Sequence, residues 1–491
     1  MKLRNQFALV LIASLSGFIT LSVSNDTVKA TVKASAASQT LRILNWEDYI
    51  YVPESDEEEP SIIDQFKDDY YARTGQRIDV VYDTYSTNEE MYSTLTLGSS
   101  TYDLVAPSDY MIERLIRENK IETIDKSAIP NYLAYASPFL QNLFEKHGWD
   151  VYAAGYMWGT LGILYNKEVT DAIDMTTWKV LWDTKYQKEI SIKDSLREGY
   201  FIGLAYVQND ALEALKVEYE DGRLTAVEYN DAISDLLNDT SEATIAKVKD
   251  ALDKLKGNIY GTEVDQGKND MIKGTVSMNT AWSGDAVYAI YEAADAGHDV
   301  LRYSLPLEGS NIWYDGFVMP KGANKDLAQA FINFVSDPKV AALNTNYIGY
   351  TSFIAGDSVL ENINSYEGVV ETPTEDTYEL DLTYFFEGTL DTMDIADAVL
   401  YIESDYVGGR LTTQYPSEDE IIRSAVMRDF GDANQKVIDM WAEFKATDGQ
   451  LWMYIVAGAT IALLVTYALY SFITKNLSSR RRRYALLARK K

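Results

Sequence analysis

Residues 41–46 read LRILNW, residues 77–83 read RIDVVYD and residues 102–108 read YDLVAPS. Each run is rich in β-branched, aliphatic or aromatic residues, which predicts a strand. A capped helix is predicted after Ser61, and the capping box Ser86-Thr-Asn-Glu89 is predicted to open another. Strands that alternate with helices at this spacing indicate βαβ units, a mostly parallel sheet and the α/β class.

Ligands of parallel sheets bind at the carboxyl ends of the strands, and Trp46 and Ser108 both lie at such ends. Val151–Asn166 (VYAAGYMWGTLGILYN) is long, apolar and rich in glycine, as expected of a strand that crosses between two lobes. After a second α/β segment, Ile312–Pro320 (IWYDGFVMP) is another candidate crossing strand. Residues 354–410 are acidic, and we interpret them as an elaboration of the second lobe.

The composition restricts the possible chemistry. The 491 residues include no cysteine, which excludes disulfides, thiolate catalysis and an N-terminal lipid on cysteine. The net charge is −31, and the last 41 residues hold eight basic and no acidic side chains, so the remainder carries −39. Such a charge repels nucleic acid and attracts cations. On charge alone an acidic surface kept for solubility is the favoured explanation, so a cationic ligand needs other evidence.

Both ends of the chain carry apolar runs. Residues 1–25 have a basic start and an uncharged stretch, which predicts a signal peptide or an N-terminal anchor. Residues 26–40 are predicted to be a spacer. Residues 451–473 carry no charge and are predicted to be a transmembrane helix, because 23 residues span a bilayer core. The arginine-rich segment 474–491 would then be a basic cytoplasmic tail, which places residues 41–446 on the extracytoplasmic side.

Little in the sequence indicates catalysis, a metal or a cofactor. The two histidines, His147 and His298, have no metal-ligand neighbours at useful spacing. Gly261–Asn269 resembles a phosphate-binding loop only loosely, because its glycine spacing is too long and Asn269 replaces the required Ser or Thr. Paired carboxylates could act on a sugar, but no local pattern selects one pair. We therefore expect a binding protein rather than an enzyme, with no cofactor and no metal.

Three short segments place an aromatic residue beside a carboxylate. They are Trp46-Glu47-Asp48-Tyr49, Trp282-Ser-Gly-Asp285 and Trp313-Tyr-Asp315. Carboxylates accept charge-assisted hydrogen bonds from ammonium groups, and aromatic faces pack on methylenes and attract cations. The mixture suits an amine with a methylene chain. Taken singly, each pair could equally be a core tryptophan next to a helix-capping aspartate.

These segments resemble the bacterial spermidine/putrescine-binding protein family, the solute-binding component of polyamine ABC importers. The resemblance covers most of residues 41–353 and resumes over about 415–446. Its most specific pieces are Asn45–Tyr49, Ser86–Met91, Tyr102–Ser108, Met157–Gly159, Leu196–Glu198, Trp282–Asp285, Trp313–Asp315 and Ile348–Tyr350.

The resemblance implies a periplasmic-binding-protein-like fold of two α/β lobes with crossing hinge strands, which closes on its ligand. We expect residues 41–155 and 316–353 in lobe 1 and residues 156–315 and 354–446 in lobe 2. The implied partners are a polyamine, such as putrescine or spermidine, and an ABC permease with its ATPase subunit. The C-terminal helix would replace a lipid anchor at the cell membrane.

The resemblance also implies the ligand-binding residues. The methylene chain would lie between Trp46, Tyr49, Trp282 and Trp313, and Glu198 and Asp315 would hold ammonium groups. Ser108 and Tyr110 would line the pocket, and Tyr350 would close it. Asp48 and Asp285 match acidic positions of the putrescine-type members, which indicates a short diamine.

Two positions depart from the spermidine-type pattern, because Ser195 replaces an aspartate and Met427 replaces a ligand-contacting glutamine. Three alternatives stay open: a binder of another cationic solute, such as an amino acid or a thiamine-like compound, a sensory or adhesion ectodomain, and a carbohydrate-active enzyme.

Overall fold

The computed structural model describes residues 39–55, 58–97 and 101–446, together with Thr460 and Thr466. The chain divides into Met1–Ser38 and Gln39–Lys491, and all described residues belong to the second part. The predicted segments 1–25 and 474–491, and the predicted helix 451–473 except for the two threonines, lie outside the described residues. Within the described part of the chain, no helix is long and apolar enough to cross a membrane.

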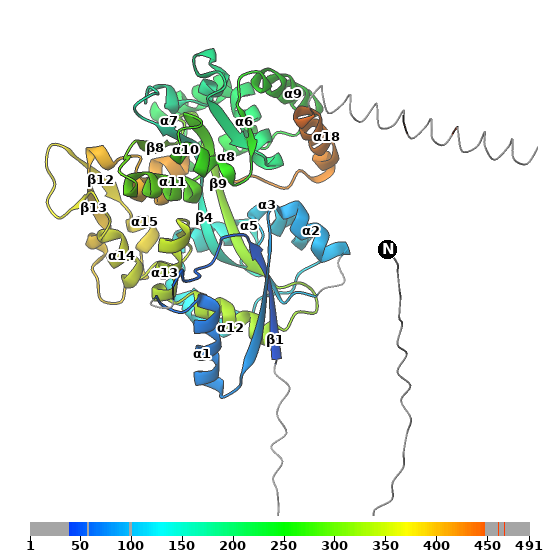
Figure 1. The fold of residues 1–491 in the computed structure, drawn as a ribbon, viewed down its shortest axis with the longest axis vertical. Coiled ribbons are helices and arrows are strands. Elements are labelled where there is room, and N and C mark those ends of the chain that lie inside the picture. The colour runs from blue at the N-terminus through cyan, green and yellow to red at the C-terminus, as the bar shows by residue number, and fades with distance from the viewer. Residues whose placement is uncertain (1–38, 56–57, 98–100, 447–459, 461–465, 467–491) are drawn as a thin grey trace, which may run out of the picture. The chain divides into compact units, whose positions relative to one another are not determined.

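One large mixed sheet organises the described residues (Figure 1). Its main path runs β2-β1-β3-β9-β4-β7-β5-β6, while β8 and β10 pair with β4, and β14 pairs with β9. The strands are β1 (Gln39–Trp46), β2 (Ile78–Tyr85), β3 (Leu104–Val105), β4 (Ala153–Asn166), β5 (Ile190–Lys193), β6 (Gly261–Glu263), β7 (Met278–Trp282), β8 (Leu301–Ser304), β9 (Ser310–Val318), β10 (Thr351–Ser352) and β14 (Ser424–Ala425).

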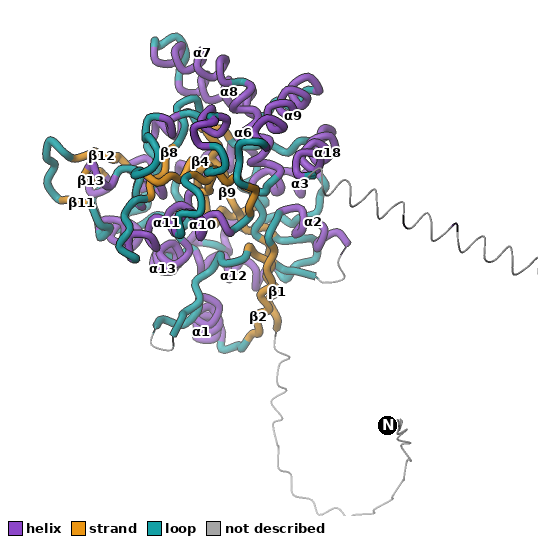
Figure 2. Tube along the Cα trace, turned by 45° about the horizontal axis from the view of Figure 1, so that its top comes forward, coloured by secondary structure: helices purple, strands orange, loops and turns teal. Residues whose placement is uncertain are grey.

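The helices surround these strands (Figure 2). They are α1 (Ile62–Thr74), α2 (Asn88–Leu97), α3 (Asp109–Arg117), α4 (Pro130–Tyr135), α5 (Pro138–His147), α6 (Leu196–Val207), α7 (Asn209–Glu220), α8 (Ala226–Leu237), α9 (Glu242–Lys256), α10 (Gln266–Ile272), α11 (Ser283–Asp295), α12 (Lys325–Val335), α13 (Pro338–Ile348), α14 (Asp357–Asn364), α15 (Thr383–Phe386), α16 (Arg410–Gln414), α17 (Glu418–Ile422) and α18 (Asn434–Lys445). Short 3-10 helices occupy Lys126–Ala128, Asp174–Thr176, Trp178–Trp182, Thr184–Tyr186, Ile395–Ala398, Ser404–Tyr406 and Gly431–Ala433.

The predicted βαβ units are present at the start of the fold. Strand β1 pairs in parallel with β2 over its whole length and with β3 at Ile43 and Leu44. Ser61 caps α1 by accepting from the backbone N–H of Asp64. The capping box predicted at Ser86-Thr-Asn-Glu89 is wrong by one residue: Thr87 Oγ1 accepts from the N–H of Glu90, whose carboxylate accepts from the N–H of Ser86. Helix α2 therefore begins at Asn88.

Two large hydrophobic cores give the fold its two lobes. The first core includes Leu41, Ile112 and Phe317, and the second includes Ile190, Phe201 and Leu252. Strand β4 contributes its first half, up to Trp158, to the first core and side chains from Leu161 on to the second. Strand β9 pairs with β4 in antiparallel register, so the two strands cross together from one core to the other (Figure 1).

A smaller three-stranded sheet lies within the acidic segment 354–410. Its strands are β11 (Val369–Val370), β12 (Thr377–Asp381) and β13 (Val399–Glu403), in the order β11-β13-β12. The buried side chains of this segment, such as Leu360, Phe385 and Ile402, pack with the first core, whereas Ala425 and Met427 pack with the second. The predicted lobe boundaries place 354–410 in lobe 2, whereas these contacts place its buried side chains in the first core. The other predicted boundaries remain a prediction.

Candidate functional site

The candidate residues come from strand ends, helix starts and the crossing strand β9. Trp46 ends β1 and Ser108 precedes α3, while Glu198 lies in the first turn of α6. Trp282 ends β7 and Asp285 lies in the first turn of α11. Polar side chains at such positions gather at the carboxyl edge of a parallel sheet.

Asp315 is the central carboxylate of this group. It lies on β9, is 4% exposed, and its Oδ2 accepts from the Tyr49 hydroxyl at 2.7 Å. Its backbone forms an isolated bridge with Ser108. Oδ1 has no hydrogen-bond partner among the described residues. Burial raises the pKa of the Asp315 carboxyl to about 7, although the nearby hydroxyls of Ser108 and Tyr49 act in the opposite direction.

Aromatic rings surround the Asp315 carboxylate. The centroid of the Tyr350 ring lies 5.2 Å from that of Tyr49 and 5.5 Å from that of Trp313, both edge-on. Tyr156, which the sequence analysis gave no role, packs on the Tyr49 ring at 5.5 Å and donates to the Tyr49 carbonyl. Tyr350 can lie here only because residue 284 is glycine: a Cβ there would be 2.2 Å from Cγ of Tyr350.

Glu198 is the second carboxylate of this group with an oxygen that accepts no hydrogen bond from the described residues. It is buried, and its Oε1 accepts from the indole N–H of Trp282 at 3.1 Å. Its Oε2 is buried without a hydrogen-bond partner in the part of the chain that the structure describes. Electrostatic repulsion from Glu198 helps to raise the Asp315 pKa.

Three other predicted residues lie around this centre. The Trp46 indole N–H donates to the Ala106 carbonyl at 2.8 Å. The Tyr110 hydroxyl donates to Glu89 at 3.3 Å, and its ring lies against the guanidinium of Arg197. Asp48 is exposed and has a positive φ of 49° in the turn after β1, so the structure does not bring it into the buried group.

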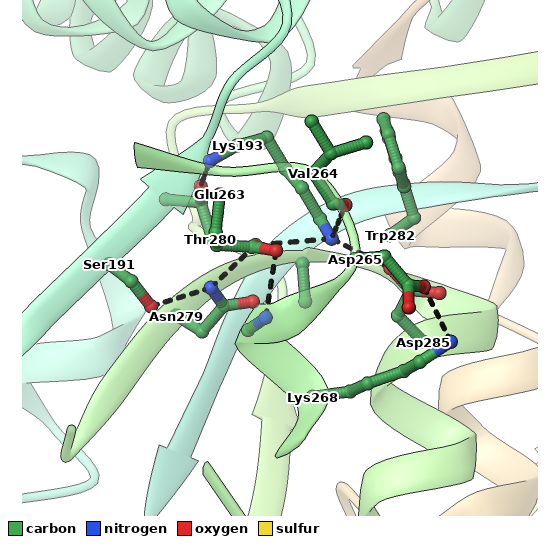
Figure 3. A network of polar contacts seen from close by, with 12 residues as sticks. Ser191, Lys193, Glu263, Val264, Asp265, Lys268, Asn279, Thr280, Trp282 and Asp285 are labelled. Atoms are coloured by element: carbon green, nitrogen blue, oxygen red, sulfur yellow. Dashed lines mark hydrogen bonds and ion pairs between the residues drawn. The ribbon is translucent and has the colours of Figure 1, made fainter. Parts of the chain in front are cut away.

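Asp285 forms an ion pair with a lysine of the same chain (Figure 3). Its Oδ2 accepts from the Lys193 ammonium at 2.7 Å. Its Oδ1 accepts from the Tyr350 hydroxyl at 2.9 Å. Burial alone would raise the pKa of Asp285, but the charges of Lys193 and Lys268 outweigh burial and hold the pKa below its ordinary value.

Sequence reasoning missed Lys193, although one local feature marks it. It is the last residue of the buried strand Ile190-Ser-Ile-Lys193, so a charged side chain stands at the carboxyl end of a strand. Sequence reasoning also missed Asp109, whose carboxylate accepts from the backbone N–H groups of Tyr110 and Tyr314. Burial raises the pKa of Asp109 to about 8.

Arg197 is a further charged residue without an assigned role. Its side chain is buried between the rings of Tyr110 and Phe430, 4.4 and 4.0 Å from their centroids. Burial lowers the pKa of this guanidinium. Tyr110 follows Asp109 on α3, next to the first core, whereas Arg197 and Phe430 lie beside the second, so the stack joins the two lobes.

An ion-pair cluster also joins the two cores. Glu113 lies on α3 between the first-core residues Ile112 and Leu115, and Arg428 follows the second-core residue Met427. Arg428 donates to both carboxylate oxygens of Glu113, at 2.6 and 3.1 Å. Among the described residues, no group of three or more His, Asp or Glu side chains is placed to hold a metal ion.

Comparisons with known proteins give the chain its relatives. A family model described as bacterial extracellular solute-binding protein matches residues 61–365. The spermidine/putrescine-binding periplasmic protein of Salmonella typhimurium is 29% identical over 315 residues, which cover 64% of this chain and 77% of the relative. The putrescine-binding periplasmic protein PotF of Escherichia coli is 29% identical over 331 residues, covering 65% and 79%.

A solved structure supports the same relationship. The spermidine/putrescine ABC transporter substrate-binding protein PotD of Streptococcus pneumoniae superposes with a TM-score of 0.54 at 26% sequence identity. The superposition covers 83% of this chain and 99% of that protein. The described residues thus have the two-lobed α/β fold of periplasmic binding proteins.

Proposed function

The chain belongs to the bacterial extracellular solute-binding protein family, and from this premise we propose that it binds a polyamine between its lobes and delivers it to an ABC importer. The two relatives described above, from Salmonella typhimurium and Escherichia coli, are named for binding spermidine/putrescine and putrescine. A receptor of this kind closes on its ligand and presents it to a permease, so we expect no chemistry on the ligand.

The observation that carries the proposal is the buried Asp315 carboxylate among aromatic rings. One of its oxygens has no protein partner within the described ranges, and the same holds for Oε2 of Glu198. An ammonium group can donate to both carboxylates, and these charge-assisted bonds offset the cost of burying them. The rings of Trp313 and Tyr350 offer faces or edges to the adjoining methylenes.

We assign the remaining roles as part of the proposal. Asp315 and Glu198 hold an ammonium group. Four aromatic residues pack on the ligand chain: Trp46, Tyr49, Trp282 and Trp313. Ser108 and Tyr110 line the pocket from the first lobe and Tyr350 closes it. Asp48 and Asp285 are the remaining predicted binding residues. Asp285 contacts Lys193 and Tyr350, so it acts on the ligand site through these two side chains.

The proposed topology completes this picture. Residues 1–25 act as a signal peptide or anchor, residues 451–473 cross the membrane and residues 474–491 lie in the cytoplasm, as the charge pattern indicates. The sequence prediction gives 41–155 and 316–353 to lobe 1 and 156–315 and 354–446 to lobe 2, but the buried side chains of 354–410 pack with the first core, so we assign this segment to lobe 1. A tethered receptor stays near its permease at a high effective concentration. Retention of the protein in membranes after alkaline extraction tests the anchor, and full release would contradict it.

Calorimetric titration of the purified full-length chain tests the ligand. The ligands are putrescine, cadaverine, spermidine and spermine, with arginine and maltose as controls. We expect one-to-one binding of at least one of the four amines and no heat from maltose. Silence with all four amines would overturn the proposal, and hydrolysis of a glycoside by the protein would replace it with an enzymatic function.

A further inference from the structure

The Lys193 ammonium is enclosed by three hydrogen-bond acceptors and an aromatic ring. The residue is 1% exposed, and its Nζ contacts three acceptors: Asp285 Oδ2 at 2.7 Å, the Val264 carbonyl at 3.0 Å and Glu263 Oε1 at 3.2 Å. The same nitrogen lies over the Trp282 ring, 4.5 Å from its centroid. Figure 3 shows the side chain reaching these partners from the end of β5.

These contacts are those that an alkylammonium ligand would need. An aromatic face and two carboxylates recognise a primary ammonium on a methylene stem, and the lysine side chain is such a group. We propose that Lys193 occupies the ammonium position beside Trp282 and Asp285, so that the preferred ligand carries one ammonium, held by Asp315 and Glu198, and an uncharged far end. This inference rests on the proposed function and narrows its ligand class.

The carboxylate oxygens around the site indicate that only one position is open to a ligand ammonium. Both oxygens of Asp285 are engaged, by Lys193 and Tyr350. Both oxygens of Glu263 are engaged as well: Oε1 accepts from Asn279 in addition to Lys193, and Oε2 accepts from the backbone N–H of Gly267. Asp315 and Glu198, by contrast, each keep one buried oxygen without a partner in the described residues.

The charge of Lys193 disfavours a second ligand ammonium in this position. Burial would lower the pKa of Lys193, but attraction from Asp285 and Glu263 outweighs burial and the pKa is raised, so the side chain stays charged. A ligand ammonium here would meet a like charge, and it would compete with Lys193 and Tyr350 for the oxygens of Asp285. An amide or hydroxyl group at the far end of the ligand avoids both costs.

Binding of two ligands that differ only at one end tests the inference. Putrescine has two ammonium groups, and N-acetylputrescine replaces one of them with a neutral amide. We expect the full-length wild-type chain to bind N-acetylputrescine at least as tightly as putrescine. Wild-type protein that binds putrescine more than tenfold more tightly would overturn the inference without any variant.

A variant that removes the lysine charge provides the second measurement. Lys193→Met alone leaves Glu263 and Asp285 without their cation, so the double variant Lys193→Met with Glu263→Gln is used, which keeps the net charge of the cluster. We expect its preference to shift toward putrescine by at least tenfold, because the ligand now supplies the cation for Asp285. The matched control is Lys216→Met with Glu220→Gln, which removes an ion pair within α7 and also keeps the net charge, and its preference should shift less than threefold.

The outcomes separate the inference from the proposed function. If the amines bind but the double variant keeps the wild-type preference within twofold, the ion pair only stabilises the fold and the inference is wrong. If the wild-type chain binds neither putrescine, its acetylated form nor any longer polyamine, the proposed function fails and the inference fails with it. Circular dichroism spectra and melting temperatures establish that the variants are folded.

Discussion

Lowering the pH from 7.5 to 5.5 should weaken amine binding markedly, because Asp315 titrates in this interval. Burial raises the pKa of its carboxyl to about 7. The ligand ammonium stays charged throughout, and it binds the ionised carboxylate. The binding-competent fraction is therefore about three quarters at pH 7.5 and about 3% at pH 5.5, which predicts a loss of affinity of about 25-fold, or about 1.9 kcal/mol.

Two neighbouring groups define the pH range of the experiment. Burial raises the pKa of Asp109 to about 8, so this carboxyl is mostly protonated over the whole interval. Burial lowers the pKa of His147 to about 4, so this imidazole stays neutral. Neither group changes its predominant protonation state between pH 5.5 and 7.5, whereas Asp315 does.

Calorimetry in buffers with different ionisation enthalpies measures the linked proton. At pH 7 about half of the Asp315 carboxyls are protonated in the free protein, so binding should release about 0.5 proton per ligand. Asp315→Asn should remove both the proton release and the pH dependence. An affinity that stays within twofold from pH 5.5 to 7.5, or an unchanged slope in Asp315→Asn, would refute the reasoning.

At pH 7.5, Asp315→Asn should weaken amine binding more than tenfold, about 1.4 kcal/mol, with no loss of folded protein, as measured by calorimetry and melting curves. Glu113→Gln should weaken binding about two- to tenfold, because it breaks a partly exposed ion pair with Arg428 that joins the two cores; titration at low and high salt measures this. Gly284→Ala should cost about 1–3 kcal/mol of stability and displace the Tyr350 ring, since the added Cβ would lie 2.2 Å from that ring; denaturant unfolding measures it.

Matched variants control these measurements. Glu220→Gln removes an exposed carboxylate that pairs with Lys216 within one helix, and it should leave ligand affinity unchanged. Gly257→Ala places its Cβ 3.6 Å from the nearest heavy atom, so it should change stability by less than about 0.5 kcal/mol. Unchanged affinity in Asp315→Asn, equal losses in Glu113→Gln and Glu220→Gln, or a Gly284→Ala as stable as Gly257→Ala would each contradict its prediction.

The start of the fold could be predicted from the sequence because its strands and helices are marked by patterns of neighbouring residues. Periodicity and helix caps over residues 41–108 indicated the parallel pairing that β1 makes with β2 and β3. The capping box was placed one residue too early, since Ser86 and Thr87 are both capping residues and only the geometry of α2 distinguishes them. Residues 354–410 have no clear alternation, so their small sheet and its packing on the first core were not anticipated.

The candidate site depends on contacts between distant parts of the chain. Tyr49 and Asp315 are 266 residues apart, and only a family resemblance could bring them together before the structure. Lys193 and Asp285 are 92 residues apart and meet because β7 lies next to β5 in the sheet. No spacing rule reveals such a pair, and a buried lysine in a short apolar strand was the one local clue to it.

The irregularity in the crossing strands has a mechanical consequence. The register between β4 and β9 shifts between Gly155 and Met157, and Met157 is the residue paired with Asp315. Such irregularities increase the local bend and twist of a strand. In the closure proposed above, rotation about this point would leave Asp315 nearly in place, whereas Glu198 and Trp282, which lie beside the second core, would approach it. Asp315 would then be the first carboxylate that an incoming cation meets, and Glu198 the second.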